Sequence, residues 1–375
     1  MHPTPTDVPP GLNGVAVTTT TIGAVDGDAG SFHYRGHDAT ALAEACSFEA
    51  VAHLVLRGSL PTERREAEFV SELASRRTLP AEAVATLRTL STSTTDPATQ
   101  LRTGLSVTGI GLPVAPLLDS TAAARGELAL ALVARFPTVV AALHRFGSGL
   151  EPITPRHDLG HAANYLWMLS GEVPTPEAAR ALEQYLILTI DHGFNASTFA
   201  ARVIASTGTD LVGVVTGALA ALIGPLHGGA PSRALDALDA IGTPANAAAW
   251  TRRELEAGHR IMGFGHAVYR APDPRSTLLG RVAAGLGGDD VDRARAVERE
   301  ILRVLAEHKP DRALPSNVEF YAGVVMERCG VPRSLFTATF ASSRLVGWCA
   351  HALEQSAEGK LIRPSSVYVG GSSGP

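Results

Sequence analysis

Lysine is almost absent from this chain of 375 residues. Only Lys309 and Lys360 occur, and the other 30 of the 32 basic residues are arginines. Neither lysine stands in a glycine-rich phosphate-binding loop of the Walker A type, which needs a lysine at a fixed place. Chemistry through a lysine Schiff base would depend on one of two positions that have no supporting motif. The sequence therefore argues against both kinds of site.

Cysteine and aromatic residues are also few. The three cysteines, Cys46, Cys329 and Cys349, lack the spacing of a metal site and cannot build a disulfide framework. We expect them to be buried free thiols in a reducing cytoplasm, and we expect neither a bound metal nor a cofactor. Aromatic residues make up 5% of the chain and the net charge is −5. A nucleic-acid partner, which would need a clustered basic surface, is therefore disfavoured.

A long membrane-spanning segment is missing as well. The longest uncharged stretch covers residues 211–232, but its helical part, residues 211–223, is too short to cross a bilayer. Residues 1–12 are rich in proline and lack the basic and apolar parts of a signal peptide, which favours a flexible tail. We expect a soluble, cytoplasmic protein that does not bind a membrane.

Helical periodicity, in contrast, recurs along most of the chain. The predicted helices cover residues 48–57, 61–75, 127–146 with a break at Pro137, 161–169, 176–189, 211–223, 233–241, 292–307, 317–329 and 333–354. Thr175, followed by proline and glutamate, is typical of a helix start. Strand signals are confined to residues 15–25 and 31–35, with a turn between them. The sequence therefore predicts a mainly α fold with a small β element near its start.

Two segments combine histidine with glycine and arginine. His227 lies in GPLHGGA at residues 224–230, where the glycines leave room for a ligand, although a structural histidine in a tight turn would look the same. His266 lies in RIMGFGHAVYR at residues 260–270, and DPR follows at residues 273–275. Arginine suits a carboxylate or a phosphate, and a nearby histidine can donate to a carbonyl oxygen. A solvated charged loop is the simpler alternative for this second segment.

Two further segments are weaker on their own. Residues 191–199, DHGFNASTF, place His192 at the end of a buried helix, where Asn195 or Ser197 could equally be helix caps. Residues 317–321, NVEFY, place Glu319 near a predicted helix start, where an exposed acid is ordinary.

Taken together, these segments resemble the citrate synthase family. The resemblance runs from about Gly14 through Gly370. It includes three short segments nearer the start: VDG at residues 25–27, YRG at residues 34–36 and LRT at residues 101–103. Its most specific stretch is GFGH at residues 263–266 with Arg270 and DPR after it. Six separated segments in the expected order are hard to obtain by chance.

The resemblance implies an all-α homodimer of two-domain subunits. Residues 13–229 and 325–375 would form a large, dimer-forming domain, and residues 230–324 a smaller helical domain that closes over the site. A charge-rich stretch at residues 273–311 agrees with such a peripheral lobe. Arg363 would reach into the site of the partner subunit.

The resemblance also assigns roles to residues of this chain. His227 would hydrogen-bond the thioester carbonyl of acetyl-CoA, His266 would polarise the ketone of oxaloacetate, and Glu319 would be the catalytic base. The remaining positions would bind substrates: His192, Arg275, Arg344 and Arg363 for oxaloacetate, and Arg270 for a phosphate of CoA. The expected enzyme is an acyltransferase that converts the acyl group to an alkyl group on transfer, and it would make citrate in the tricarboxylic acid cycle.

The sequence departs from the family pattern at three places. Glu319 stands where an aspartate is usual, which moves the carboxylate by about an ångström unless the backbone compensates, and a misplacement of that size can cost roughly 100-fold in rate. Gly193 replaces a common acidic residue, and Thr95-Asp96-Pro97 replaces a histidine-proline pattern. Two alternatives therefore stay open: a 2-methylcitrate synthase that uses propionyl-CoA, because a pocket discriminates one methylene weakly, and a catalytically weak paralogue that binds CoA or oxaloacetate.

Overall fold

The computed structural model describes residues 8–12, 14–92, 96–224, 227–228, 230–266, 268–310 and 312–370. The α-helices are α1 (Ala39–Ala45), α2 (Phe48–Arg57), α3 (Glu63–Arg76), α4 (Ala81–Ser91), α5 (Pro97–Val107), α6 (Ala122–Gly147), α7 (His161–Ser170), α8 (Pro176–Thr189), α9 (Ala196–Ser206), α10 (Leu211–Leu222), α11 (Ala230–Ile241), α12 (Pro244–Glu256), α13 (Pro274–Leu286), α14 (Asp289–His308), α15 (Val318–Arg328) and α16 (Phe336–Glu358). Residues 1–7 of the predicted tail, Thr95, and Asp311 of the charge-rich stretch lie outside the described residues.

The predicted mainly helical fold is confirmed, and several of the predicted helix ends have the expected chemistry. The side chain of Thr175 accepts a hydrogen bond from the backbone N–H of Ala178 and so caps α8. Gly58 ends α2 in the left-handed conformation, with φ of 91°. Short 3-10 helices supplement the α-helices: η2 (Pro10–Leu12), η3 (Leu117–Asp119) and η4 (Arg333–Leu335).

The small β element is shorter than the sequence predicts. Strands β1 (Gly23–Asp26), β2 (Ser31–Tyr34) and β3 (His37–Asp38) form one antiparallel sheet in that order. Residues 15–22 of the first predicted strand are not part of it, so this part of the prediction is wrong. Instead, the backbone N–H and the hydroxyl of Thr21 both donate to the carboxylate of Glu354 at 2.8 Å. A side chain of α16 therefore satisfies the polar groups that a neighbouring strand would otherwise bind.

The predicted break at Pro137 is also wrong. Helix α6 runs without interruption from Ala122 to Gly147. A proline inside a helix costs about 3 kcal/mol, but the neighbouring Phe136, Val139 and Val140 are buried in the core, and burying each such side chain gains about 1.5–3 kcal/mol. By length and composition α6 could cross a membrane, but 83% of its most apolar window is buried inside the protein. It is the long core helix of a helical body.

Helix α16 forms the centre of that body. It is buried along most of its length, and α2, α6, α8, α9 and α10 pack against it. At Gly347 it passes so close to the end of α8 that a Cβ atom would lie 2.3 Å from the carbonyl oxygen of Ile190. The thiols of Cys329 and Cys349 are free and buried, and that of Cys46 is free and half-buried.

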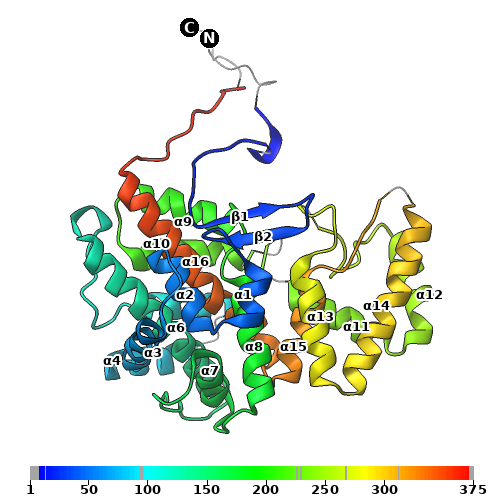
Figure 1. Cartoon of the computed structure of the whole chain (residues 1–375), viewed down its shortest axis with the longest axis horizontal. Helices are drawn as coiled ribbons and strands as arrows, with labels where there is room; N and C mark the ends of the chain where they lie inside the picture. Colours follow the sequence, from blue (N-terminus) through cyan, green and yellow to red (C-terminus); the bar gives the residue numbers. More distant parts are fainter. Residues whose placement is uncertain are drawn as a thin grey trace.

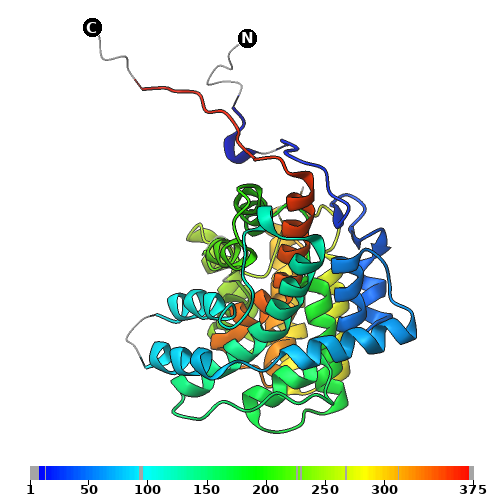
Figure 2. The same cartoon turned by 90° about the vertical axis from the view of Figure 1, so that its left-hand side faces the viewer.

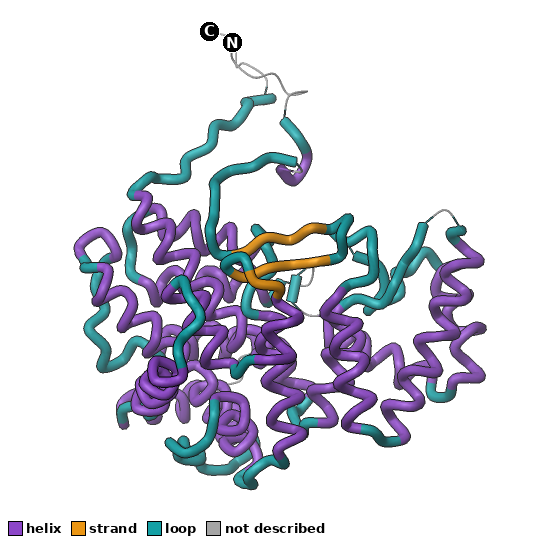
Figure 3. The backbone as a smooth tube through the Cα atoms, in the orientation of Figure 1, coloured by secondary structure: helices purple, strands orange, loops and turns teal. Residues whose placement is uncertain are grey.

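Helices α11 to α14 lie together on one side of the molecule, beyond α8 (Figure 1). The sheet lies at the boundary between this group and the larger helical body (Figure 3). The chain before β1 and the chain after α16 leave the body on the same side and run next to each other (Figure 2).

The close approach at Gly347 generates a prediction about stability. Gly347→Ala is expected to lower the free energy of unfolding by about 1–3 kcal/mol, because the added methyl group forces α16 away from α8. Urea denaturation measures this change. Gly126→Ala in α6 is the matched control, since a Cβ there meets nothing within 4 Å, and it should leave stability unchanged or slightly raise it. Equal effects of the two changes would contradict the packing argument.

Candidate active site

His266 and Arg275 form the centre of the candidate active site. Nδ1 of His266 accepts hydrogen bonds from the backbone N–H groups of Val268 and Tyr269, both at 3.0 Å. The pKa of His266 is lowered to about 4 by burial and by the charge of Arg275, so the ring is neutral and its proton lies on Nε2. Nε2 is 3.2 Å from Nη2 of Arg275. His266 therefore presents one donor next to the guanidinium donors of Arg275, an arrangement that suits a single shared acceptor such as a carbonyl oxygen.

Asp273 holds Arg275 in this place. Its carboxylate accepts hydrogen bonds from Nε of Arg275 at 3.0 Å and from Nη2 at 2.8 Å, and it also accepts the Arg275 backbone N–H. The same carboxylate accepts the backbone N–H of Val318 at 3.1 Å. Asp273 is 1% exposed, and the pKa of its carboxyl group is lowered because the attraction of Arg275 and these hydrogen bonds outweigh burial. One buried anion thus ties the start of α13 to the start of α15.

Glu319 stands at the first turn of α15, next to the His266 segment. Asn317 caps the helix by accepting the Glu319 backbone N–H at 3.0 Å, while its amide donates to the carbonyl of Gly265 at 2.8 Å. The backbone N–H of Asn317 donates in turn to the carbonyl of Gly263. Burial raises the pKa of Glu319 to about 7, against the opposing charge of Arg275. The carboxyl group can therefore accept a proton near neutral pH.

His227 is held by the start of α9. Its Nε2 accepts the backbone N–H of Ser197 at 3.3 Å and lies 2.9 Å from Oγ of the same serine. Oγ also accepts the indole N–H of Trp348 at 3.1 Å and donates to Asn195, the cap of α9, at 2.8 Å. Since the backbone N–H can only donate, Nε2 is the acceptor and the proton of His227 lies on Nδ1. Burial and the charge of Arg344 lower the pKa of His227 to about 4.

Arg344 extends the positive side of the site from α16. It is 2% exposed, and its Nε donates to the carbonyl of Thr189 at 2.8 Å. Burial lowers its pKa, while the nearby carboxylate of Asp191 opposes the shift. His192 follows Asp191, and its ring centroid lies 5.6 Å from that of His266. His192, Arg344, Arg275 and His266 therefore belong to one electrostatic cluster.

Two predicted residues lie apart from this cluster. The Arg270 side chain is exposed, and its backbone N–H donates to the carbonyl of Gly27 at 2.9 Å. Arg363 is exposed in the segment that follows α16. Of the predicted motifs, Pro225, Leu226, Gly229 and Ala267 lie outside the described residues.

Several side chains that support the site were not predicted from the sequence. Asp273 and Asn317 are neighbours of predicted residues in the chain, and Trp348 stands one helical turn after Arg344, a spacing that places two side chains on one face. Their closeness to predicted site residues in the chain is the signal by which the sequence could have identified them.

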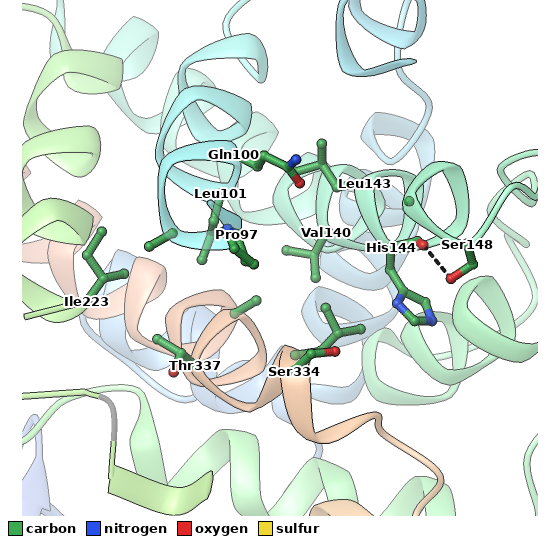
Figure 4. Close-up of a pocket in the computed structure, with 14 residues that line it drawn as sticks. Pro97, Gln100, Leu101, Val140, Leu143, His144, Ser148, Ile223, Ser334 and Thr337 are labelled. Atoms are coloured by element: carbon green, nitrogen blue, oxygen red, sulfur yellow. Dashed lines mark hydrogen bonds between the residues drawn. The ribbon is translucent and has the colours of Figure 1, made fainter. Parts of the chain in front are cut away.

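A groove of about 510 Å³ lies elsewhere, between α5, the end of α6 and the start of α16 (Figure 4). Its lining is mainly apolar, from Leu101, Val140 and Leu143, with His144 at one end. Thr337 of this groove donates to the carbonyl of Gly228 at 3.2 Å. None of the predicted site residues lines it.

Asp273→Asn is expected to lower the free energy of unfolding by about 3–5 kcal/mol, because it leaves the buried charge of Arg275 without its partner. The native pKa of Asp273 lies below its unfolded value, so its contribution is complete above about pH 3.9 and is lost as the pH falls through the native pKa. The difference between variant and wild type in urea denaturation should therefore shrink in that acidic range.

Asp158→Asn is the matched control for this prediction. The carboxylate of Asp158 also accepts hydrogen bonds from Nε and Nη2 of an arginine two residues away, Arg156, but that pair is exposed. Its loss should cost much less than the loss of the buried pair, because solvent screens an exposed ion pair. A similar cost for both changes would contradict the assignment of Asp273 as the buried anchor.

Comparison with known proteins agrees with this geometry. The family model described as "Citrate synthase, C-terminal domain" matches residues 11–365. Citrate synthase 2 of Bacillus subtilis is 38% identical, covering 96% of this chain and 95% of that protein. The 2-methylcitrate synthase of Mycobacterium tuberculosis is 41% identical, covering 97% and 91%.

Solved structures are similar throughout their length. Citrate synthase of Thermotoga maritima superimposes with a TM-score of 0.85 at 36% identity, covering 97% of this chain and 96% of that one. The ternary complex of citrate synthase from Thermoplasma acidophilum, with carboxymethyl coenzyme A and oxaloacetate, has a TM-score of 0.89 at 28% identity, covering 98% and 97%. The chain belongs to the citrate synthase family.

Proposed function

We propose that the protein is a citrate synthase, which condenses acetyl-CoA with oxaloacetate and hydrolyses citryl-CoA to citrate and CoA. One observation carries the proposal: the donors of His266 and Arg275 lie 3.2 Å apart, a spacing that suits one shared acceptor, and the charge of Arg275 also acts on Glu319, a carboxyl group whose pKa is about 7. The acceptor is the ketone oxygen of oxaloacetate, and the carboxyl group is the base. The Thermoplasma relative holds the same two kinds of ligand together, a coenzyme A derivative and oxaloacetate.

The first step is removal of a proton from the methyl group of acetyl-CoA. This proton is very weakly acidic, so Glu319 needs help for the charge that develops on the thioester oxygen. Nδ1–H of His227 supplies a donor whose ring is neutral and fixed by Ser197. A preorganised donor in a site with little water stabilises such a charge strongly.

The second step is attack of the resulting enol on oxaloacetate. The ketone oxygen becomes negative, accepts hydrogen bonds from Nε2–H of His266 and from the guanidinium of Arg275, and is then protonated to the hydroxyl group of citryl-CoA, which balances the proton that Glu319 removed. Arg344 and His192 hold the substrate carboxylates and so orient the ketone. Water then hydrolyses the thioester. Arg270, exposed at the edge of the site, binds a phosphate of CoA.

Closure of residues 230–324 over the substrates excludes water until condensation is complete. Gly263 and Gly265, with φ of 85° and 78°, stand where this part meets the site and tolerate backbone conformations that other residues avoid.

The proposal includes a homodimer in which Arg363 acts in the partner's site. Helix α10 carries no charged residue, and its exposed residues are the small Gly213 and Ala220, with Thr216 and Gly217 half-buried between them. The segment that holds Arg363 leaves the body and exposes apolar side chains, including Tyr368 and Val369 at 82% and 76%. A second copy would cover both surfaces. The cytoplasmic location stays a prediction from composition.

Release of CoA from acetyl-CoA and oxaloacetate tests the proposal directly. Purified wild-type protein should turn over both substrates, and Glu319→Gln should lose at least about 100-fold in kcat because the base is deleted at constant size. Glu177→Gln, which changes an exposed glutamate in the first turn of α8, should keep full activity. No turnover by wild type would refute the proposal, and preference for propionyl-CoA would reassign the protein as a 2-methylcitrate synthase.

The rate should depend on pH through Glu319. Only the ionised carboxylate removes a proton, so kcat/KM is expected to rise with pH through a midpoint near 7 and then level off. His192, His227 and His266 are neutral throughout this range, because the pKa of each is lowered. Steady-state rates between pH 5.5 and about 8.5 measure the profile. A flat profile would show that Glu319 is not the titrating base.

A mixed dimer tests the role of Arg363. Arg363→Ala and Glu319→Gln subunits, co-expressed with different tags and purified as the mixed dimer, should each be nearly inactive alone. Together they should restore about half of wild-type activity, because one of the two shared sites receives both intact residues. A mixed dimer as inactive as its parents would contradict a shared site.

A further inference from the structure

Tyr269 links the segment of the site that follows α12 to the segment that follows α8. Its side chain is 4% exposed, and its hydroxyl group lies 2.9 Å from Nε2 of His192. The two residues are 77 positions apart in the chain. This hydrogen bond joins residues 230–324 to the larger helical body.

The direction of the hydrogen bond follows from the chemistry of the two groups. Burial and the charges of Arg275 and Arg344 hold the pKa of His192 well below its usual value, while burial raises the pKa of Tyr269. Both groups are therefore neutral. A phenol O–H is a better donor than an imidazole N–H, and an imidazole nitrogen is a better acceptor than a phenol oxygen. Tyr269 thus donates to Nε2, which leaves the proton of His192 on Nδ1.

The ring of Tyr269 is fixed by its neighbours. Its centroid is 4.7 Å from that of His266 and 5.4 Å from that of His192, and the guanidinium carbon of Arg275 lies 5.8 Å from it. The backbone of Tyr269 also donates to Nδ1 of His266. Tyr269 therefore contacts three of the residues that bind oxaloacetate in the proposed mechanism.

The turn between β1 and β2 supports the segment that carries Tyr269. Besides the hydrogen bond from Arg270 to Gly27, a Cβ atom on Gly27 would lie only 2.3 Å from the carbonyl oxygen of Val268. Gly30 approaches Ala271 in the same way, with a Cβ distance of 2.9 Å. In Figure 1 this hairpin points toward the group of helices that includes α13. The turn between β1 and β2 therefore packs against residues 268–271, the segment that carries Tyr269.

We propose that Tyr269 is a positioning residue for oxaloacetate, which fixes the ring and the tautomer of His192 so that Nδ1–H donates to a substrate carboxylate. The proposal rests on the proposed function. It assigns Tyr269 no contact with the substrate, so the hydroxyl should affect oxaloacetate binding only through His192.

Tyr269→Phe removes the hydroxyl and keeps the ring. Titration calorimetry with oxaloacetate alone should give a Kd that is about 3- to 10-fold higher, the equivalent of one lost hydrogen bond. The KM for acetyl-CoA should not change. Tyr321→Phe is the matched control, since Tyr321 is similarly buried, at 5% exposed, but its hydroxyl group bonds Glu298 instead, and it should leave the Kd unchanged. An unchanged or lower Kd for Tyr269→Phe would overturn the proposal; a lower one would mean that the hydroxyl competes with substrate.

His192→Asn separates positioning from a general structural effect. The amide N–H of asparagine lies where Nδ1–H of histidine lies and has no tautomer to fix. In this background Tyr269→Phe should raise the Kd less than about 2-fold. A full 3- to 10-fold increase, as in the parent, would show that Tyr269 does not act through His192. Absence of oxaloacetate binding by wild type would refute the proposed function itself, which distinguishes the two failures.

Discussion

The buried carboxylate of Asp273 is the interaction on which the active site depends. It stands at the amino ends of both α13 and α15, where the backbone N–H groups of two helices point at one anion. Arg275 balances the charge of Asp273, and this ion pair holds its guanidinium beside His266. Without this anion, the start of α15 and Glu319 in its first turn would have no fixed relation to His266 and Arg275. One carboxylate therefore sets the geometry of a site assembled from segments about 45 residues apart.

Burial sets the protonation states that the chemistry needs. Desolvation is the largest cause of the lowered pKa of His227 and His266 and of the raised pKa of Glu319. The same physical effect therefore gives two neutral histidines and a carboxyl group that titrates near neutral pH. The position of Glu319 has a separate cause: it stands in the first turn of a helix whose cap, Asn317, is bonded to the His266 segment.

The sequence alone predicted the fold class and most of the clustered residues, because their motifs are local. His266 and Arg275 stand nine positions apart, so a single loop brings them together. The failures have a common cause in tertiary contacts. Pro137 stays helical because its neighbours are buried, and Thr21 binds Glu354, 333 positions away, in place of a strand partner. Tyr269 was visible inside the His266 motif, but nothing in the chain indicates that its hydroxyl meets a histidine 77 positions earlier.

The scarcity of lysine has a practical consequence for measuring movements of the peripheral helices and of the segment after α16. Both lysine side chains are exposed, and they stand in different parts of the molecule. Lys309 caps the end of α14 in the peripheral group of helices, and Lys360 stands just beyond α16, three residues before Arg363. Amine-directed dyes will therefore attach, besides an amino terminus, at Lys309 in the peripheral group of helices and at Lys360 in the segment that follows α16. These two lysines are labelling sites for fluorescence experiments on both parts of the molecule, with no engineered cysteine needed.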